Sequence, residues 1–289
     1  ISINHNFEGF YPRFLVGNIQ NSFPSISFTH SYYDSSSCVA DSDFWNRIDE
    51  NFYDSSVYFP IFVNDNHYTD LVIYPNFSPS EYALQIELYD KLGTKLFENP
   101  SFYNIKSNES KLIKIKFKKL IEDMNLDKNK IASAKVITKF AQKKIPTRIK
   151  FGLNVGISGI KSKLPCNICF NSNLGNPSIE NKPGSFHWSP IFKNGNCIVT
   201  LANFSNKKNY SQLANLSLNF YHQNDPQHIS RDIVIKPNAE FRIILNNDDE
   251  LKKFFMNDGW MTAKSDNPHI QGYYFTFYPS GSVSGDHIF

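Results

Sequence analysis

Residues 84–89 read Leu-Gln-Ile-Glu-Leu-Tyr, and residues 216–221 read Leu-Ser-Leu-Asn-Phe-Tyr. Each stretch alternates apolar and polar residues, and a period of two predicts a β-strand with one buried face. Four further matches occur, and all five stand in the same order in both halves of the chain. They are residues 60–62 with 190–192, 76–78 with 203–205, 105–108 with 235–238, and 118–121 with 252–255. All five offsets lie between 127 and 134 residues. This self-similarity predicts two copies of one unit in tandem.

The length of the chain also favours two units, because 289 residues are enough for two domains that each bury a core. We expect an aromatic-rich N-terminal segment over residues 1–56 that packs on a first domain over residues 57–170. A linker over residues 171–186, dense in Asn, Ser, Gly and Pro, is expected to lead to a second domain over residues 187–289.

Strand signals recur at close spacing in both units. Residues 90–93 (Asp-Lys-Leu-Gly) predict a hairpin turn after the strand at 84–89. Residues 112–118 predict another strand, in which Ile113, Ile115 and Phe117 alternate with lysines. The same period predicts strands over much of the second unit.

Helix signals are short by comparison. They cover residues 42–48, 120–124 and 251–256, the last preceded by cap-type residues at 247–250. Short strands without long intervening helices disfavour a parallel α/β sheet. The predicted fold class is all-β: two tandem antiparallel β-sandwich domains, jelly-roll or immunoglobulin-like, of similar topology with short helical crossovers.

The composition is typical of a soluble globular protein, with 40% hydrophobic and 15% aromatic residues. No apolar run approaches the roughly 18 residues that a spanning helix needs, so no membrane span is predicted. The chain opens Ile-Ser-Ile-Asn-His, without an initiator Met or a signal-peptide pattern. That start indicates a processed or trimmed product.

Positive charge is concentrated in one segment. Residues 106–163 hold 16 of the 30 basic and four of the 27 acidic residues, so their formal charge is +12 and that of the remainder is −9. Lys114, Lys116 and Lys118 stand on one face of the predicted strand at 112–118. A basic segment can attract phosphate, sulfate or uronate groups. The alternative is that lysines on an edge strand prevent sheet-to-sheet aggregation, which is a common use of lysine there.

The stretch at residues 152–159 superficially suggests a phosphate-binding loop, and the equivalent region of the second unit, residues 272–285, also contains glycines. Neither has the Lys-Ser/Thr pair and following helix of a P-loop, or the βαβ context of a dinucleotide loop. Both stretches are predicted to be turns or bulges near the last strands of their units.

The four cysteines are Cys38, Cys166, Cys169 and Cys197. The lone Cys-x-x-Cys pair lacks the second pair of a zinc ribbon, and residues three apart on a strand point to opposite faces. Buried free thiols are favoured over a disulfide, and a disulfide over a metal site.

Comparing the two units singles out residues of the second. Asp286 and His287 stand where the first unit has Asn167 and Ile168, and His187 and Trp188 stand where it has Val57 and Tyr58. These side chains could bind a divalent cation or line a polar pocket, whereas the simpler interpretation is a solvated chain end.

A second polar cluster contains His30 and Asp34, four residues apart in a serine-rich stretch. No Gly-x-Ser-x-Gly turn surrounds them, so no catalytic triad is assigned. The candidate metal ligands are therefore His30, Asp34, Asp286 and His287, and no organic cofactor is predicted.

Aromatic rings with polar edges suit sugar rings and bases, although aromatic residues also fill sheet cores. The candidate ligand-binding residues combine such rings with the lysine face: Tyr32, Tyr33, Trp45, His187, Trp188, Lys114, Lys116 and Lys118.

The leading functional hypothesis is a non-catalytic protein that binds a carbohydrate or another anionic polymer through aromatic and basic surface residues. One alternative is a metal-dependent or acid–base enzyme with a His/Asp site in the second domain. Another is a structural subunit, in which the basic segment of one copy meets the acidic remainder of another. Nucleic acid is disfavoured as a partner, because the chain lacks a basic helix or an RNP-like strand.

Overall fold

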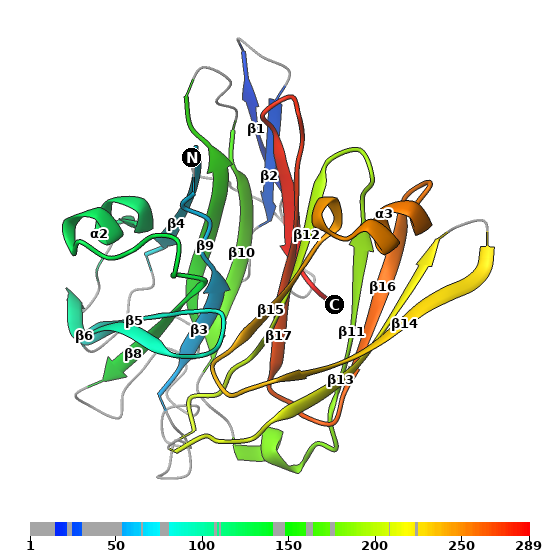
Figure 1. The fold of residues 1–289 in the computed structure, drawn as a ribbon. Coiled ribbons are helices and arrows are strands. Elements are labelled where there is room, and N and C mark those ends of the chain that lie inside the picture. The colour runs from blue at the N-terminus through cyan, green and yellow to red at the C-terminus, as the bar shows by residue number, and fades with distance from the viewer. Residues whose placement is uncertain are drawn as a thin grey trace, which may run out of the picture.

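The structure is a computed structural model, and it describes residues 15–21, 25–30, 54–64, 66–75, 81–106, 109, 111–140, 148–159, 164–173, 177–207, 209–222 and 225–289 (Figure 1). Within these residues the protein is nearly all-β, with several antiparallel sheets and two short α-helices. The all-β class predicted from the sequence is therefore confirmed. This part of the chain contains no helix with the length and apolar character needed to span a lipid bilayer.

The first half of the chain forms a hairpin and two four-stranded sheets. Sheet 1 has the strand order β3-β8-β5-β6, and sheet 2 has the order β10-β9-β4-β7. The strands are β1 (Leu15–Gln20), β2 (Ser25–His30), β3 (Ser56–Pro60), β4 (His67–Ile73), β5 (Tyr82–Tyr89), β6 (Lys95–Ile105), β7 (Ile113–Lys116), β8 (Ser133–Phe140), β9 (Arg148–Ile157) and β10 (Cys166–Asn173). Strands β1 and β2 pair with each other.

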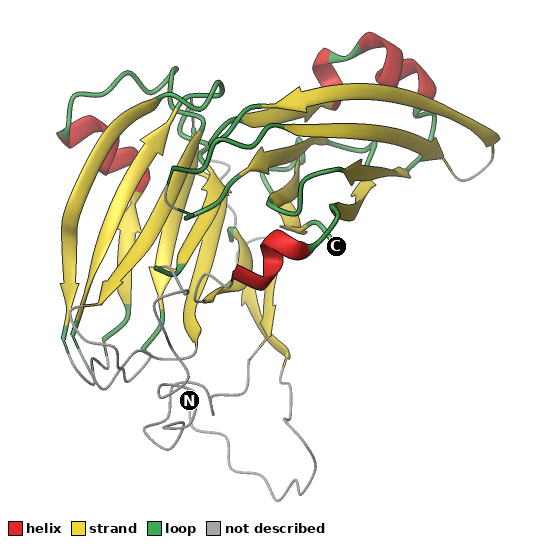
Figure 2. Ribbon diagram, turned by 90° about the horizontal axis from the view of Figure 1, so that it is seen from below, coloured by secondary structure: helices red, strands yellow, loops and turns green. Residues whose placement is uncertain are grey.

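The second half also forms two four-stranded sheets. Sheet 3 has the order β11-β16-β13-β14, and sheet 4 has the order β15-β12-β17-β18. The strands are β11 (Ser185–Ile191), β12 (Asn196–Asn203), β13 (Ala214–His222), β14 (Asp225–Ile235), β15 (Glu240–Ile244), β16 (Gly259–Ser265), β17 (Ile270–Phe277) and β18 (Val283–His287). Figure 2 shows the two groups of strands side by side, with the strands of one group inclined to those of the other.

The strand order of the second half repeats that of the first. When β3 to β10 are replaced in sequence by β11 to β18, the order of sheet 1 becomes that of sheet 3 and the order of sheet 2 becomes that of sheet 4. The sequence matches fall on corresponding elements: residues 84–89 lie in β5 and residues 216–221 lie in β13.

The two helices occupy corresponding places, because α2 follows β7 and α3 follows β15, its counterpart in the second half. Helix α2 (Phe117–Asp123) buries Phe117, Leu120 and Ile121 and has no side-chain N-cap. Helix α3 (Asp249–Phe254) follows the short 3₁₀ helix η3 (Leu245–Asn247), and the Asp248 carboxylate caps it by accepting a 3.1 Å bond from the Leu251 N–H. The predicted strand at 112–118 ends early at Lys116, because Phe117 already begins α2.

Sheet 4 is covered on both of its faces. Val199 and Leu201 of β12 belong to a buried cluster shared with sheet 3. Ile198 and Ala202, which alternate with them, belong to a cluster shared with sheets 1 and 2, as does Phe275 of β17. Because side chains alternate between the two faces of a strand, β12 contributes to both buried clusters and so connects the two halves.

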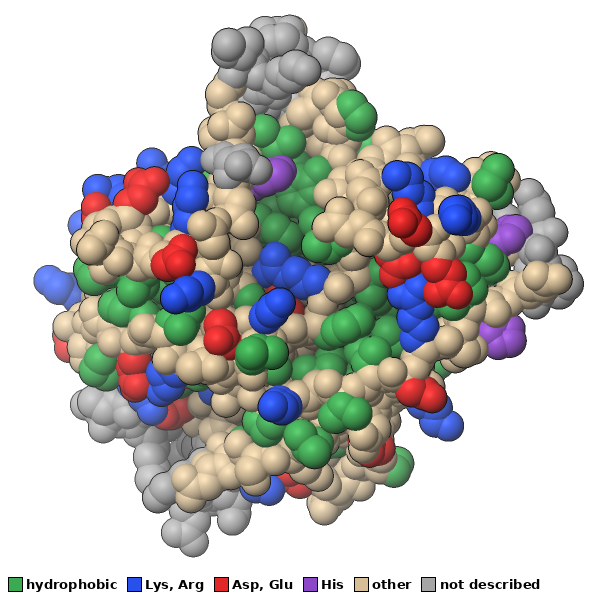
Figure 3. Space-filling model, in the orientation of Figure 1, with side chains coloured by type: hydrophobic (Ala, Val, Ile, Leu, Met, Phe, Trp, Pro, Cys, Tyr) green, Lys and Arg blue, Asp and Glu red, His purple; other side chains and the backbone are tan. Residues whose placement is uncertain are grey.

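The junction between the halves is aromatic and polar. The Phe62 ring lies 5.1 Å from that of Phe275, and the Tyr58 ring lies 4.6 Å from that of Phe204, between ring centroids. On the face drawn in Figure 3, hydrophobic side chains gather along the middle, between the two groups of sheets, with Lys and Arg side chains beside them. Aromatic pairs of this kind contribute roughly 0.5–1.5 kcal/mol each beyond the area that they bury.

The prediction of turns or bulges at the glycine stretches is wrong for most of the glycines. Gly152 and Gly156 lie inside β9 in regular register with β4. A Cβ on Gly152 would come within 2.6 Å of the Tyr74 hydroxyl, so the glycine makes room for a ring of the neighbouring segment. Within these two stretches, only Gly159 and Gly281 have the positive φ values, 104° and 87°, that a turn glycine adopts.

Cys166, Cys169 and Cys197 are buried free thiols, as the sequence analysis favours, while Cys38 lies outside the described residues. The Cys166 Sγ donates a 3.2 Å bond to the Gly285 carbonyl of the other half. Burial raises the pKa of this thiol to about 12, which leaves it without thiolate reactivity at neutral pH.

The segment predicted as a linker is partly regular. Strand β10 continues to Asn173 because residues 171–173 pair with residues 148–150 of β9. The short 3₁₀ helix η2 (Pro177–Asn181) follows, and β11 begins at Ser185.

Candidate ligand-binding face

The outward face of sheet 3 is built by strict alternation along its strands. In β13, Leu216, Leu218 and Phe220 are buried, whereas Ser217 is exposed between them. The same period holds in β16, where Met261 and Ala263 are buried beneath the sheet. The outward residues therefore form a surface of their own, which we call the sheet-3 face.

The register of the four strands places these outward residues in rows. From β11 across to β14, the rows are Phe186, Lys264, Ser217 and Asp232; then Trp188, Thr262, Asn219 and Ser230; then Pro190, Trp260, Tyr221 and His228. Polar residues fill the interior of the face, and aromatic residues stand along its β11 edge and across its last row.

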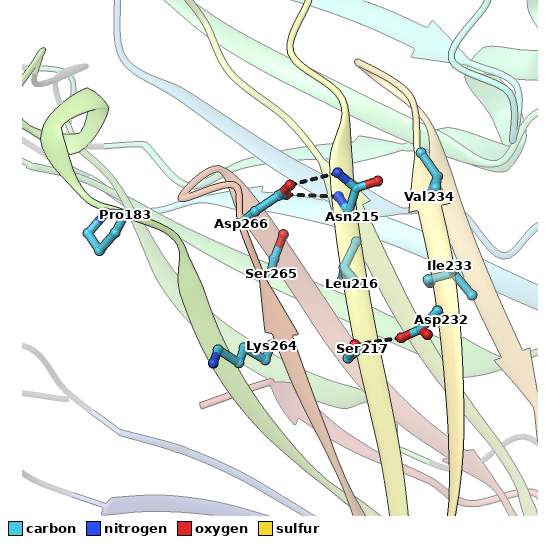
Figure 4. Close-up of a pocket in the computed structure, with 10 residues that line it drawn as sticks. All are labelled: Pro183, Asn215, Leu216, Ser217, Asp232, Ile233, Val234, Lys264, Ser265 and Asp266. Atoms are coloured by element: carbon cyan, nitrogen blue, oxygen red, sulfur yellow. Dashed lines mark hydrogen bonds between the residues drawn. The ribbon is translucent and has the colours of Figure 1, made fainter.

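A groove of about 570 Å³ runs over one end of this face. Figure 4 shows its residues: Asp266 and Asn215 lie against each other, Ser217 lies against Asp232, and Lys264 extends from β16. The Asp266 carboxylate accepts a 2.9 Å bond from the Asn215 backbone N–H and a 2.6 Å bond from its side-chain amide. The Ser217 hydroxyl donates a 2.5 Å bond to Asp232.

These groups present both kinds of hydrogen-bonding partner. Each carboxylate offers about four lone-pair sites, so Asp232 and Asp266 retain acceptor capacity after the bonds described above. Lys264 adds up to three N–H donors. Pro183 and Val234 supply apolar walls. A groove with a few polar groups between apolar walls is the usual form of a site for a small molecule or a single sugar unit.

A stack of rings closes the other end of the face. The Tyr221 ring lies 5.6 Å from Trp260 at an interplanar angle of 17°, and 5.4 Å from His228 at 26°. Tyr221 is therefore covered on both ring faces by its neighbours. The stack presents ring edges and two outer ring faces rather than a flat platform.

Trp188 lies at the edge of the same face and pairs with the last residue of the chain. The backbone N–H of Trp188 donates a 2.6 Å bond to the Phe289 carbonyl, and the backbone N–H of Phe289 donates a 3.0 Å bond to the Trp188 carbonyl. The Phe289 ring in turn lies 5.0 Å from the His287 ring. The Phe289 ring thus lies near both Trp188, a predicted ligand-binding residue, and His287, a predicted metal ligand.

Phe186 is a residue that the sequence analysis missed. It precedes Trp188 by two positions on β11 and shares its face, and it is 64% exposed against 38% for Trp188. The signal was present in the sequence, because alternation places Phe186 and Trp188 together and excludes His187.

The assignment of His187 to the ligand-binding set is not supported by its position. It lies on the opposite face of β11 from Trp188, and its Nε2 atom has no hydrogen-bond partner among the described residues. Burial lowers the pKa of this histidine, while a bond to the backbone of Ile270 partly offsets the effect. His187 is therefore a half-buried neutral ring.

The predicted metal ligands do not assemble in the part of the chain that the structure describes. His287 Nε2 and Asp286 Oδ1 are 3.8 Å apart, but no group of three or more His, Cys, Asp or Glu side chains there could hold a metal ion. Protein zinc sites use three or four such ligands. Only the backbone of His30 is described, and Asp34, Tyr32, Tyr33 and Trp45 lie outside the described residues.

The predicted lysines lie on the first half of the chain, away from the sheet-3 face. Lys114 and Lys116 are exposed on β7, the edge strand of sheet 2, and Lys114 pairs with Asp70 at 2.8 Å. Lys118 lies in α2. The location of Lys114 and Lys116 agrees with the edge-strand alternative. The positions of all three lysines separate the predicted basic residues from the predicted aromatic residues.

Comparison of the chain with known protein families, with curated proteins and with solved structures finds no match.

Proposed function

We propose that the protein binds a saccharide through the sheet-3 face. The observation that carries this proposal is the groove that pairs Asp232, Asp266 and Lys264 with the apolar walls of Pro183 and Val234. Sugar hydroxyls both donate and accept hydrogen bonds, so they match carboxylates beside an ammonium group. The C–H faces of a sugar ring pack on apolar and aromatic side chains such as Val234 and Trp188.

Comparison of the two halves supports this choice of face. Tyr58, Lys135 and Glu87 occupy one row of sheet 1, in the same strands and register as Trp188, Thr262 and Asn219 in sheet 3. The second half covers the row in sheet 1, where Tyr58 is 1% exposed, whereas Trp188 is 38% exposed. The Tyr58 position of sheet 1 is covered, whereas the equivalent Trp188 position of sheet 3 is open to a ligand.

The charge of the groove favours a neutral sugar. Asp232 and Asp266 against Lys264 leave a formal charge of −1 on its lining. An acidic polymer would meet like charge there, which costs affinity. The proposal therefore narrows the predicted ligand from an anionic polymer to an uncharged saccharide at this site.

The architecture that the proposal assumes is a pair of tandem β-sandwich domains, over residues 57–170 and 187–289, derived from one duplicated unit. The repeated strand order and the ordered sequence matches support it. Duplication leaves one copy able to provide the junction while the other acquires a binding task.

A glycan array followed by calorimetric titration of the best neutral oligosaccharide tests the proposal. Trp188→Ala and Asp232→Ala are each expected to weaken binding about tenfold, the equivalent of roughly 1.4 kcal/mol. Tyr103→Ala is the matched control, because Tyr103 is an aromatic residue of equal exposure, 39%, on β6. Absence of binding to any neutral glycan, or equal losses in all three variants, would overturn the proposal.

A further inference from the structure

A second cleft lies at the junction of the two halves. Its floor is the outward face of sheet 1, and its other wall comes from residues 205–207, 209, 210 and 238 of the second half. The cleft holds about 420 Å³, which is within the usual range for small-molecule sites. We call it the lysine cleft after the four lysines that line it: Lys95, Lys135, Lys139 and Lys207.

The charge of the lining is strongly positive. Among the described lining residues, Glu87 is the only carboxylate against four lysines, which leaves a formal charge of +3. Glu87 is already engaged, because it accepts bonds from Gln85 Nε2 at 2.8 Å, from the Tyr89 hydroxyl at 2.5 Å and from Lys95 Nζ at 3.0 Å. Hydrogen bonds from Tyr89 and Lys95 lower the pKa of Glu87 against the opposing effect of burial.

Three of the lysines have carboxylate partners at the rim of the cleft. Lys95 pairs with Glu98 at 2.7 Å, Lys139 with Asp54 at 2.6 Å, and Lys207 with Glu180 at 3.1 Å. These pairs are partly exposed, and exposed pairs contribute little energy, about 0–1 kcal/mol. Lys139 and Lys207 can therefore turn towards an anion in the cleft at small cost, whereas Lys95 also bonds the buried Glu87 carboxylate.

Lys135 differs from the other three. It is 5% exposed, its ammonium donates a 3.2 Å bond to the Ser205 carbonyl, and it lies 4.8 Å from the centre of the Phe204 ring. Both of these partners are neutral, so its charge is buried without a carboxylate in direct contact. A buried cation of this kind is costly unless a counter-charge joins it.

We propose that the lysine cleft binds a phosphate or sulfate group carried by a small molecule. Such a group adds to the attraction that Lys135 already receives from the Glu87 carboxylate, and its oxygens accept charge-assisted bonds from several lysines at once. The site is separate from the sheet-3 face, so the two proposals stand or fall independently.

Proton uptake gives the proposal a signature that general electrostatic attraction would not reproduce. Burial lowers the pKa of Lys135 to about 8; attraction by the Glu87 carboxylate opposes this effect, and repulsion from Lys95 and Lys139 adds to it. Near that pH the amine is partly unprotonated, and a bound anion favours its charged form. Binding is therefore expected to take up a fraction of a proton, detectable by calorimetry in buffers of different ionisation enthalpy.

The experiment titrates the full chain with inorganic phosphate, inorganic sulfate, glucose 6-phosphate and N-acetylglucosamine 6-sulfate at constant ionic strength. Tighter binding of an ester than of the matching inorganic ion identifies a substituted small molecule as the ligand, and equal binding identifies the free ion. Lys135→Gln is expected to weaken binding at least tenfold and to abolish proton uptake. Lys139→Gln, at a more exposed residue, is expected to weaken binding about threefold while leaving the fold intact.

Lys119→Gln is the matched control, because Lys119 is an exposed lysine of α2 that pairs with Asp123 outside the cleft. It is expected to bind all four probes as the unmodified chain does. The proposal is overturned if none of the probes saturates the protein at about 10 mM, a concentration well above the dissociation constant of even a weak specific site. Undiminished binding by Lys139→Gln, or a loss as large in Lys119→Gln, would overturn it equally.

Discussion

The hydroxyl of Tyr273 donates a 2.8 Å hydrogen bond to the backbone carbonyl of Tyr58, across the junction of the two halves. The Tyr58 hydroxyl in turn donates to the carboxylate of Glu240, which also accepts a bond from Arg242. Arg242 donates further to the carbonyl of Ala132 in the first half. A carboxylate with a fully buried side chain is thus held by a phenol from one half and a guanidinium from the other.

Arg242→Ala is expected to destabilise the protein by about 3–5 kcal/mol, because it leaves the buried Glu240 carboxylate without its cation. Tyr58→Phe removes one neutral donor from the same carboxylate, and a smaller loss of about 1–3 kcal/mol is expected. Urea unfolding followed by fluorescence measures both. Should Tyr58→Phe cost as much as Arg242→Ala, the ion pair would not be the dominant contact at the junction.

Gly93 and Gly159 offer a matched pair of glycines with positive φ, 87° and 104°. A Cβ on Gly93 would lie 2.5 Å from the Pro237 carbonyl oxygen of the second half, whereas one on Gly159 would meet nothing within 4 Å. Gly159→Ala is expected to cost about 1 kcal/mol through backbone strain alone.

Gly93→Ala introduces the same backbone strain and also a clash with the Pro237 carbonyl oxygen. Its loss of stability is therefore expected to exceed that of Gly159→Ala by at least about 1 kcal/mol, as at other overpacked sites. Thermal and urea unfolding of the two variants give the comparison. Equal losses would mean that the hairpin at residues 90–94 is not packed against the second half as described.

Local pattern accounts for the elements that the sequence predicts well. The alternation at residues 84–89 and 216–221 requires only that one face of each strand be buried. The repeat in the sequence places Tyr58 and Trp188 at equivalent positions. The cap at Asp248 and the hairpin at residues 90–93 depend on similarly short-range signals.

Long-range packing accounts for what the sequence could not predict. Glu87 and Lys135 stand at polar positions of an alternating pattern, which indicates a solvated face, yet the second half covers them. The glycines of β9 suggest turns by their local propensity, but the Tyr74 ring on the neighbouring segment sets the need for glycine there. The lysine cleft arises from two segments that meet only in the folded chain.

The stability of the protein is expected to fall between about pH 7 and pH 5.5, where histidines titrate. Burial lowers the pKa of both His187 and His269 below the ordinary value of 6.5, despite the Glu180 carboxylate 3.0 Å from His269. A histidine with a lowered pKa binds its proton more readily in the unfolded chain. Its contribution to the free energy of unfolding is therefore fully present above pH 6.5, and it is lost as the pH falls towards the pKa of the histidine in the folded protein.

Urea unfolding at the two pH values tests this expectation in the unmodified chain and in His187→Gln. The variant should lose less stability on acidification, because one of the two responsible groups is gone. Carboxylates such as Asp248, whose pKa is lowered by bonds from Arg231, lose their contribution only at lower pH and do not interfere. Identical pH dependence in variant and unmodified protein would show that His187 is not held neutral by burial.

Asp248 combines two roles that substitution can separate. Its carboxylate caps α3 through the Leu251 N–H and accepts two bonds from the Arg231 guanidinium, of which the Nη2–Oδ1 bond measures 2.9 Å. Asp248→Asn keeps a capping oxygen but removes the charge, and Asp248→Ala removes both. The loss of the cap alone is expected to cost about 1 kcal/mol. The free energy of unfolding of Asp248→Ala, measured with urea, should therefore be lower than that of Asp248→Asn by about 1 kcal/mol.

Glu250→Gln is the control that removes a charge from the Arg231 pair and leaves the helix cap in place. Glu250 also pairs with Arg231 but is more exposed than Asp248. A small effect, below about 1 kcal/mol, is expected for this partly exposed pair. If Asp248→Asn proves as damaging as Asp248→Ala, the ion pair rather than the cap stabilises α3. The helix would then depend on β14, the strand that carries Arg231, for its place in the fold.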